Sequence, residues 1–342
     1  MATITLSMIA KDEEAFIANA IESVKDIVDE IIVVDTGSKD STPAIARELG
    51  AKVLHFKWND DFSAARNFGL KEATSDWVLV LDADEELLKE QAPKLRQMAE
   101  LGNDAYMFMQ KNFSNTQAFG FSPEARKGFK GFYPSFIFRM FRTGKGIEFS
   151  GFVHETIDAS LAKIKARIGM SDVPIYHFQE LKGADVFREK QLRYAEMLEK
   201  GLNKYPDKAK AYHHIGIAYY RFRDDYEKAI NCFEKSIQHN NKNAFVHNDL
   251  AAAYAQTGEY KKALDSFGES LKIRPEPSTF YNIGFLQEKL GDYEAAAIAY
   301  EEAAKRNHPK KTELLEKAEL LRALAKKEND GKQQGQDFAR QQ

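Results

Sequence analysis

The sequence predicts an α/β domain with a Rossmann-like mixed sheet, followed by an all-α solenoid of helical repeats. Up to about residue 180, short apolar runs alternate with stretches of helical periodicity. From about residue 185 onward the strand signal disappears, and one motif recurs every 33 or 34 residues. The length of 342 residues agrees with this division, because it corresponds to about two domains.

The N-terminal half begins with a β-α-β unit. The run 4–9 predicts a strand, the apolar residues between Phe16 and Val24 recur at helical spacing, and the continuous run 31–34 predicts a buried strand. Thr42-Pro43 and Gly50 bracket a second helix as its N-cap, first-turn proline and C-terminal glycine. The remaining elements are a strand over 53–56, a helix over 63–73 and a strand over 77–81. Ligands are therefore expected beyond the carboxyl ends of these strands.

The C-terminal half repeats a pair of helices. Tyr226, Ala229, Phe233 and Ser236 recur as Tyr260, Ala263, Phe267 and Ser270, and again as Tyr293, Ala296, Tyr300 and Ala303. Together with the small residues Gly216, Ala251 and Gly284, this pattern resembles the tetratricopeptide repeat over about 205–309. An extra residue in the first repeat, around 223–225, predicts a longer turn there.

These patterns predict three segments. Residues 1–182 form the α/β domain, and 183–326 form a solenoid of about three repeats with flanking helices over 186–202 and 312–326. The polar, low-complexity residues 327–342 are expected to be disordered.

The composition argues against several classes of protein. The 49 basic and 52 acidic residues give a net charge of −3, which argues against a nucleic-acid binder. No signal peptide and no apolar run of about 20 residues is found, so no transmembrane segment is expected. The single cysteine, Cys232, excludes an internal disulfide and a cysteine-rich metal site. The expected location is the cytoplasm.

Polar motifs follow two of the predicted strands, and a third lies in a predicted helix. Asp82 and Asp84 follow the run WVLVL, where one carboxylate could bind a sugar hydroxyl and the other a divalent cation. The same pattern also occurs in solvated loops and at helix starts. Asp35 precedes a polar loop and could accept a hydrogen bond from a nucleobase, and Arg66 could reach a phosphate or form a structural ion pair.

Taken together, these motifs resemble glycosyltransferase family 2, whose fold is named GT-A. The resemblance rests on four segments in the family's order, which are SMIAKDEE (7–14), VVDTGSKDST (33–42), DDFSAARNFGLKEA (60–73) and DWVLVLDADEE (76–86). It implies that Lys11 and Glu13 lie near the base and ribose, that Asp35 binds the base, and that Arg66 lies near the nucleotide. The pair Asp82 and Asp84 would hold the ribose and a metal-bridged diphosphate. Asp12 stands where the family often has Asn.

Two later segments extend the resemblance. Gly151 to Glu155 looks like the motif that holds the catalytic acid in this fold, so Glu155 is the candidate general base. His177 matches the histidine that often completes the metal site with Asp84, and His154 competes for that role. Taken without the family, an isolated His-Glu pair is more often structural.

The aromatic segment 119–141 allows two interpretations. Residues 126–133 fit a mobile acceptor loop and a hairpin equally well, whereas 135–141 favour a strand with Phe136, Phe138 and Met140 on one face.

The resemblance implies a metal-dependent, hexosyltransferase-type enzyme. It would move a sugar with inversion from a nucleotide-diphosphate sugar, such as a UDP-sugar, to an acceptor hydroxyl, with Mn²⁺ or Mg²⁺ at the diphosphate. A protein or peptide acceptor held by the repeats is one alternative, and a cell-envelope saccharide is another. A non-catalytic tetratricopeptide adaptor is the third, although its nucleotide motifs should then lack the acids. A phosphatase would place its Asp-x-Asp pair after the first strand, and a nucleotidyltransferase would have a glycine-rich phosphate loop.

Overall fold

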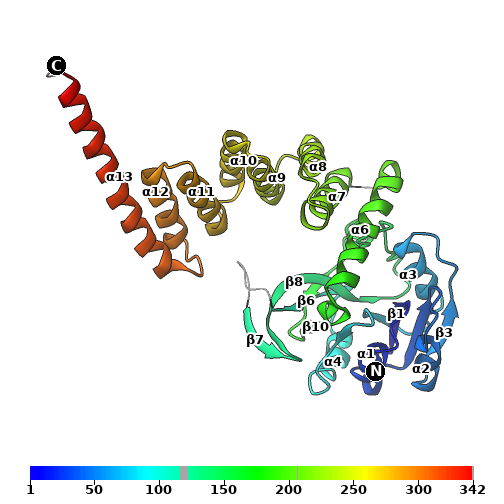
Figure 1. Ribbon diagram of the computed structural model, residues 1–342. Helices are drawn as coiled ribbons and strands as arrows, with labels where there is room; N and C mark the ends of the chain where they lie inside the picture. The colour runs from blue at the N-terminus through cyan, green and yellow to red at the C-terminus, as the bar shows by residue number, and fades with distance from the viewer. Residues whose placement is uncertain (116–121, 206, 341–342) are drawn as a thin grey trace. The chain divides into compact units, whose positions relative to one another are not determined.

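The computed structural model describes residues 1–115, 122–205 and 207–340, and the chain divides into two compact units, Met1–Lys190 and Gln191–Gln342 (Figure 1). The division lies within helix α6 (Ala184–Gly201), close to the boundary expected after residue 182. Within the described part of the chain, none of the helices combines the length and the apolar composition that a membrane crossing requires.

The first unit is built on one mixed sheet. In the described residues its strand order is β3-β2-β1-β4-β8-β6-β10-β5, with β7 beside β8 and β9 beside β6. The strands are β1 (Ile4–Ala10), β2 (Glu30–Asp35), β3 (Lys52–His55), β4 (Trp77–Val80), β5 (Glu85–Glu86), β6 (Ala105–Ser114), β7 (Ser122–Arg126), β8 (Phe129–Arg142), β9 (Ile168–Met170) and β10 (Ile175–His177). The first four strands are parallel, and β8 is antiparallel to both β4 and β6. This confirms the mixed sheet that the sequence predicts.

Helices cover both faces of the sheet. One core cluster joins the sheet to α1 (Ile17–Glu22), α2 (Thr42–Glu48) and α4 (Lys94–Glu100). A second cluster, on the opposite face, contains residues of β4 and β8 together with α5 (Asp158–Lys163) and the end of α3 (Phe62–Leu70). The short helices η1 (Lys25–Ile27) and η2 (Gln179–Lys182) complete this unit. Strands β1 to β4 and helices α1, α2 and α3 are the elements that the apolar periodicity predicts.

A bulge separates residues that the sequence places on one face. Tyr106 pairs with Met140 and Met107 with Phe138, so Arg139 has no partner in this register. Met140 therefore lies in the core cluster with α1 and α4, whereas Phe138 packs in the cluster on the other face. The expectation that Phe136, Phe138 and Met140 share a face is wrong for Met140, because one extra residue reverses the alternation of the strand.

Residues 126–133, for which the sequence allows a loop or a hairpin, form part of a hairpin. Strands β7 and β8 pair around a turn at Lys127 and Gly128, both of which have positive φ. Phe129 and Phe132 pack with Phe113, Tyr176 and Phe178 in a cluster of their own. Part of the segment, residues 119–121, lies outside the described residues.

The second unit is a helical solenoid, as the sequence predicts. After α6 and η3 (Leu202–Lys204), the paired helices are α7 (Lys208–Phe222) with α8 (Tyr226–His239), α9 (Ala244–Gln256) with α10 (Tyr260–Ile273), and α11 (Pro277–Lys289) with α12 (Tyr293–Lys305), followed by α13 (Lys311–Arg340). Buried residues of α12 and α13 form one core cluster, which includes Tyr300, Leu314 and Leu321.

Two sequence expectations differ from the structure here. The connections 223–225, 257–259 and 290–292 have equal lengths, so the extra residue of the first repeat lies in the longer helix α7 and not in the turn. Asp224 occupies the positive-φ position that glycine holds in the other two turns. Helix α13 packs against α12 through Leu314 and Leu321 and continues to Arg340, through most of the segment expected to be disordered.

Candidate active site

The polar motifs converge at one edge of the sheet. Because β1, β2 and β4 are parallel, their carboxyl ends lie side by side, and the segments that follow them begin at Lys11, Thr36 and Leu81. Asp35 is the last residue of β2, and Asp82 lies two residues beyond β4. The parallel register therefore brings together motifs that are up to 70 residues apart in the sequence.

The loops after β1 and β2 are joined by hydrogen bonds. The backbone N–H of Lys39 donates to the Asp12 carboxylate at 2.7 Å, and that of Asp12 donates to Ser38 Oγ at 3.0 Å. The amide oxygen of an asparagine could accept the same bond, so Asp12 preserves the local geometry of the motif. The side chain of Lys11 is exposed and makes no hydrogen bond or ion pair among the described residues.

Asp35 is held beneath these loops. Its Oδ1 accepts a hydrogen bond from the Ser38 backbone N–H at 3.0 Å, and its Oδ2 lies 3.2 Å from His55 Nδ1. The side chain is 5% exposed. A carboxylate can accept about four hydrogen bonds, so Asp35 retains acceptor capacity for a donor at the loop.

Arg66 connects two of the predicted acids. Its Nη2 lies 2.6 Å from Asp82 Oδ1, and its Nε lies 2.5 Å from Glu155 Oε1. The guanidinium is buried from water on α3, and Asp61 caps the start of that helix by accepting from the Ala64 N–H. Burial opposes the charge of Arg66, but its two acidic partners outweigh burial and raise its pKa.

A second arginine completes this network. Arg139 Nη2 lies 2.9 Å from Asp82 Oδ2 and 2.7 Å from Glu85 Oε1. Burial disfavours a charged Asp82, but Arg139 and Arg66 outweigh burial and hold its pKa well below its usual range. Burial dominates at Glu85, where it raises the pKa together with repulsion from Asp82. Asp82 nevertheless keeps a third of its side chain exposed, so a further donor can reach it.

Asp84 belongs to a separate cluster. His177 Nε2 lies 3.5 Å from Asp84 Oδ1, and Lys182 Nζ lies 2.8 Å from Asp84 Oδ2 and 2.6 Å from Glu13 Oε1. Burial disfavours the charge of Asp84, but His177 and Lys182 outweigh burial and lower its pKa. At Glu13 the effect of burial exceeds that of Lys182 and raises the pKa. Lys182 thus joins Glu13 to Asp84.

Asn112 fixes the orientation of the His177 ring. Its Nδ2 donates to the Tyr133 carbonyl at 3.1 Å and to Ser135 Oγ at 3.0 Å, so its Oδ1 faces His177 Nδ1 at 2.8 Å. Because an amide oxygen only accepts, Nδ1 carries the proton and donates. In the neutral ring Nε2 is then the nitrogen with a lone pair, and it faces Asp84.

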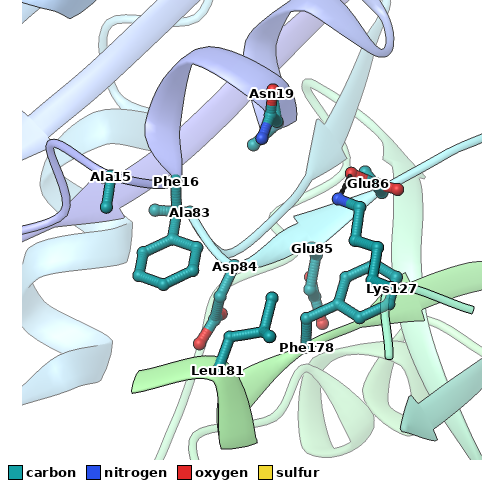
Figure 2. A pocket seen from close by; sticks show the side chains of 11 residues that line it. Ala15, Phe16, Asn19, Ala83, Asp84, Glu85, Glu86, Lys127, Phe178 and Leu181 are labelled. Carbon is teal, nitrogen blue, oxygen red and sulfur yellow. Dashed lines mark hydrogen bonds and ion pairs between the residues drawn. The ribbon is translucent and has the colours of Figure 1, made fainter. Parts of the chain in front are cut away.

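A cavity of about 210 Å³ opens beside Asp84. Phe16, which precedes α1, lines it together with Phe178, Leu181 and Asp84, and Lys127 pairs with Glu86 beside it (Figure 2). The cavity gives ligands access to one side of this carboxylate.

Comparisons with known proteins assign a family to each part of the chain. Residues 5–152 match the model of glycosyl transferase family 2, and 208–276 and 277–307 match models of the tetratricopeptide repeat. The N-terminal domain is a family 2 glycosyl transferase domain. The domain that follows it is a tetratricopeptide solenoid.

Several proteins are similar to this chain. A tetratricopeptide-repeat-containing protein of Synechococcus elongatus is 33% identical over 89% of this chain and 66% of its own length. An uncharacterized glycosyltransferase of Rickettsia felis is 50% identical over 26% of this chain and 31% of its own length. The match to the crystal structure of S. aureus TarS 1–349 in complex with UDP-GlcNAc covers 79% of this chain and 91% of the TarS chain. The identity is 18% and the TM-score is 0.45. The chain spans less than two thirds of the length of these two curated relatives.

The glycosyl transferase domain has a donor set that fits a divalent cation. Asp84 and His177 offer carboxylate oxygen and imidazole nitrogen, both of which are ligands for Mn²⁺. Asp84 Oδ2 is buried, and the ammonium of Lys182 lies 2.8 Å from it. The described residues hold no group of three or more His, Cys, Asp or Glu that could bind a metal, so a cation here would need further ligands from the nucleotide or from water.

Three residues of the two clusters are not identified by the sequence motifs. Arg139 lies in an aromatic strand, where an arginine between apolar residues was the available signal, and Glu85 lies within the segment DWVLVLDADEE, where the two aspartates were the predicted ligands. Lys182 lies in a polar segment that gave no signal.

Proposed function

We propose that this protein transfers a sugar, with inversion, from a nucleotide-diphosphate sugar such as a UDP-sugar to an acceptor hydroxyl. The observation that carries the proposal is the contact of Arg66 with both Asp82 and Glu155, within a family 2 glycosyl transferase domain. One guanidinium thereby joins a candidate donor ligand to the candidate general base. An adaptor with a degenerate first domain would have no need of this buried ionic network.

The donor is proposed to lie along the edge formed by β1, β2 and β4. Asp35 would accept from the imide N–H of the base, with Lys11 on the exposed loop beside it. Asp82 would accept from a ribose hydroxyl through its exposed side. Asp84 and His177 would hold a divalent cation against the diphosphate, which supplies charge stabilisation as the diphosphate leaves. The proximity of His177 to Asp84 favours it over His154 for this role.

Glu155 is proposed to remove the proton of the acceptor hydroxyl. Arg66 binds Oε1 of Glu155 and fixes the carboxylate, which is 11% exposed. The proposed proton acceptor is Oε2, which Arg66 does not bind in this contact. Holding the base in one orientation lowers the cost of reaching the geometry for attack on the anomeric carbon.

We propose a protein or peptide acceptor over a cell-envelope saccharide. The solenoid contains a cavity of about 350 Å³, lined by residues of α7 to α9 that include Lys210, His213, Asn243 and Phe245. An exposed phenyl ring beside hydrogen-bonding groups suits an extended peptide. The test is binding of the full chain to an array of random peptides. If Phe245→Ala binds the array as strongly as wild type does, this acceptor site is wrong.

The transfer is tested with labelled nucleotide sugars and Mn²⁺. We expect Asp84→Asn to lower turnover by about 10² to 10³ through lost stabilisation of the diphosphate. Glu155→Gln should lower it by about 10² to 10⁴ while nucleotide binding persists. Asp172→Asn, on an exposed carboxylate paired with Lys94, is the matched control. Wild-type turnover in both Asp84→Asn and Glu155→Gln would refute the site.

A further inference from the structure

Lys182 occupies the position of a counter-cation. Its ammonium lies between Asp84 and Glu13, at 2.8 and 2.6 Å, and 5.5 Å from the centre of the Phe16 ring. The side chain is 16% exposed, whereas the Asp84 side chain is 4% exposed. A positive charge thus already lies against the carboxylate that would bind a metal.

This contact leaves an acceptor atom unsatisfied. Glu13 Oε2 is buried and accepts no hydrogen bond among the described residues, whereas Asp84 Oδ2 has the ammonium of Lys182 at 2.8 Å. His177 Nε2 lies 3.5 Å from the other oxygen of Asp84, and Lys182 is the group that joins the two carboxylates. A further hydrogen-bond donor, or a cation, would satisfy the buried oxygen of Glu13.

The position of Lys182 in the chain allows it to move. It ends η2, and Gly183 follows with φ 93°, while the neighbouring Leu181 is 44% exposed and lines the cavity beside Asp84. A lysine ammonium is a point charge on a flexible four-carbon stem. It can leave Asp84 without rearrangement of the sheet.

We propose that Lys182 is a tethered counter-cation that neutralises Asp84 and Glu13 before the donor binds and then pairs with the diphosphate of the donor. Two consequences follow, and both rest on the proposed function for the identity of the donor. A divalent metal must compete with Lys182 for Asp84, and a nucleoside diphosphate keeps measurable affinity when metal is absent. Lys182 is thus a donor-binding residue that the sequence motifs do not identify.

The first experiment measures Mn²⁺ binding to the nucleotide-free full chain by electron paramagnetic resonance. We expect Lys182→Met to bind Mn²⁺ at least about tenfold more tightly than wild type, because a like charge beside Asp84 is removed. Lys127→Met is the matched control, since its ammonium borders the same cavity but pairs with Glu86. It should change the affinity by less than about twofold.

The second experiment measures UDP binding in EDTA by calorimetry. We expect Lys182→Met to weaken binding at least about tenfold, whereas Lys182→Arg, which keeps the charge, and Lys127→Met stay near wild type. Unchanged Mn²⁺ affinity or unchanged UDP affinity in Lys182→Met would overturn the proposal. If Lys182→Met does not fold, UDP binding in EDTA is still measured with wild type and Lys182→Arg. The proposal is then overturned if wild type does not bind UDP in EDTA.

The two experiments separate this proposal from the proposed function. Mn²⁺ competition requires no nucleotide, so it can succeed even if no UDP-sugar is a substrate. If wild type binds UDP with Mn²⁺ but not in EDTA, the transferase remains supported and the tethered counter-cation is wrong.

Discussion

At the scale of single residues, the buried charges depend on one another. Arg139 reaches Asp82 and Glu85 because the bulge in β8 turns it out of the strand alternation. Removing one member of a buried ionic network leaves an uncompensated charge, which costs more than the net contribution of the pair.

Arg139→Met should therefore destabilise the N-terminal domain by about 3 to 5 kcal/mol. Adding Glu85→Gln should recover part of this loss, because the stranded carboxylate is neutralised while its hydrogen-bonding shape is kept. Urea denaturation followed by tryptophan fluorescence measures both effects. A neutral single variant, or an additive double variant, would contradict the coupling.

Cys232 gives a second prediction at this scale. Burial in α8, together with repulsion from Glu199, raises the pKa of its thiol to about 11. At pH 8 the thiolate fraction is then roughly 200-fold lower than for an ordinary thiol with a pKa near 8.5. We expect iodoacetamide to modify the native chain at least that much more slowly than the urea-unfolded chain. Equal rates would show that Cys232 is accessible in the native state.

At the scale of elements, the periodicity of apolar residues predicts the parallel strands and the repeat helices, because burial on one face fixes that periodicity. It could not reveal the bulge at Arg139, which depends on pairing between β6 and β8. Nor could it place the extra residue of the first repeat, since a helix and a turn both accept one more residue. The sequence predicts Asp82 and Asp84 as site residues. It does not identify Arg139, which pairs with Asp82, or Lys182, which pairs with Asp84.

The glycines of the solenoid test its packing. A Cβ on Gly216 would lie 2.5 Å from the Phe233 ring, whereas a Cβ on Gly268 in α10 meets nothing within 4 Å. Gly216→Ala should destabilise the solenoid by about 1 to 3 kcal/mol through overpacking. Gly268→Ala should stabilise it by about 0.5 to 1 kcal/mol, because alanine has the higher helix propensity. Thermal unfolding followed by circular dichroism distinguishes them, and equal effects would contradict the packing.

At the scale of the whole molecule, the chain combines two units with different cores. The sheet unit holds the buried ionic network and the solenoid unit holds the three helix pairs, and each has its own apolar clusters. Both tryptophans of the sequence, Trp58 and Trp77, lie in the sheet unit, whereas the helix signal comes largely from the solenoid. Tryptophan fluorescence and far-ultraviolet circular dichroism therefore report different units.

This difference allows ligand binding to be assigned to a unit. UDP with Mn²⁺ at about 100 times its Kd should stabilise the sheet unit by about 2.7 kcal/mol. For a unit of this size, that corresponds to a rise of roughly 5 to 10 °C in the fluorescence midpoint, with a smaller shift of the helix signal. Asp84→Asn should lose most of the fluorescence shift. Equal shifts of both signals would mean that the two units unfold together, and a flat response of both would count against nucleotide binding by the sheet unit.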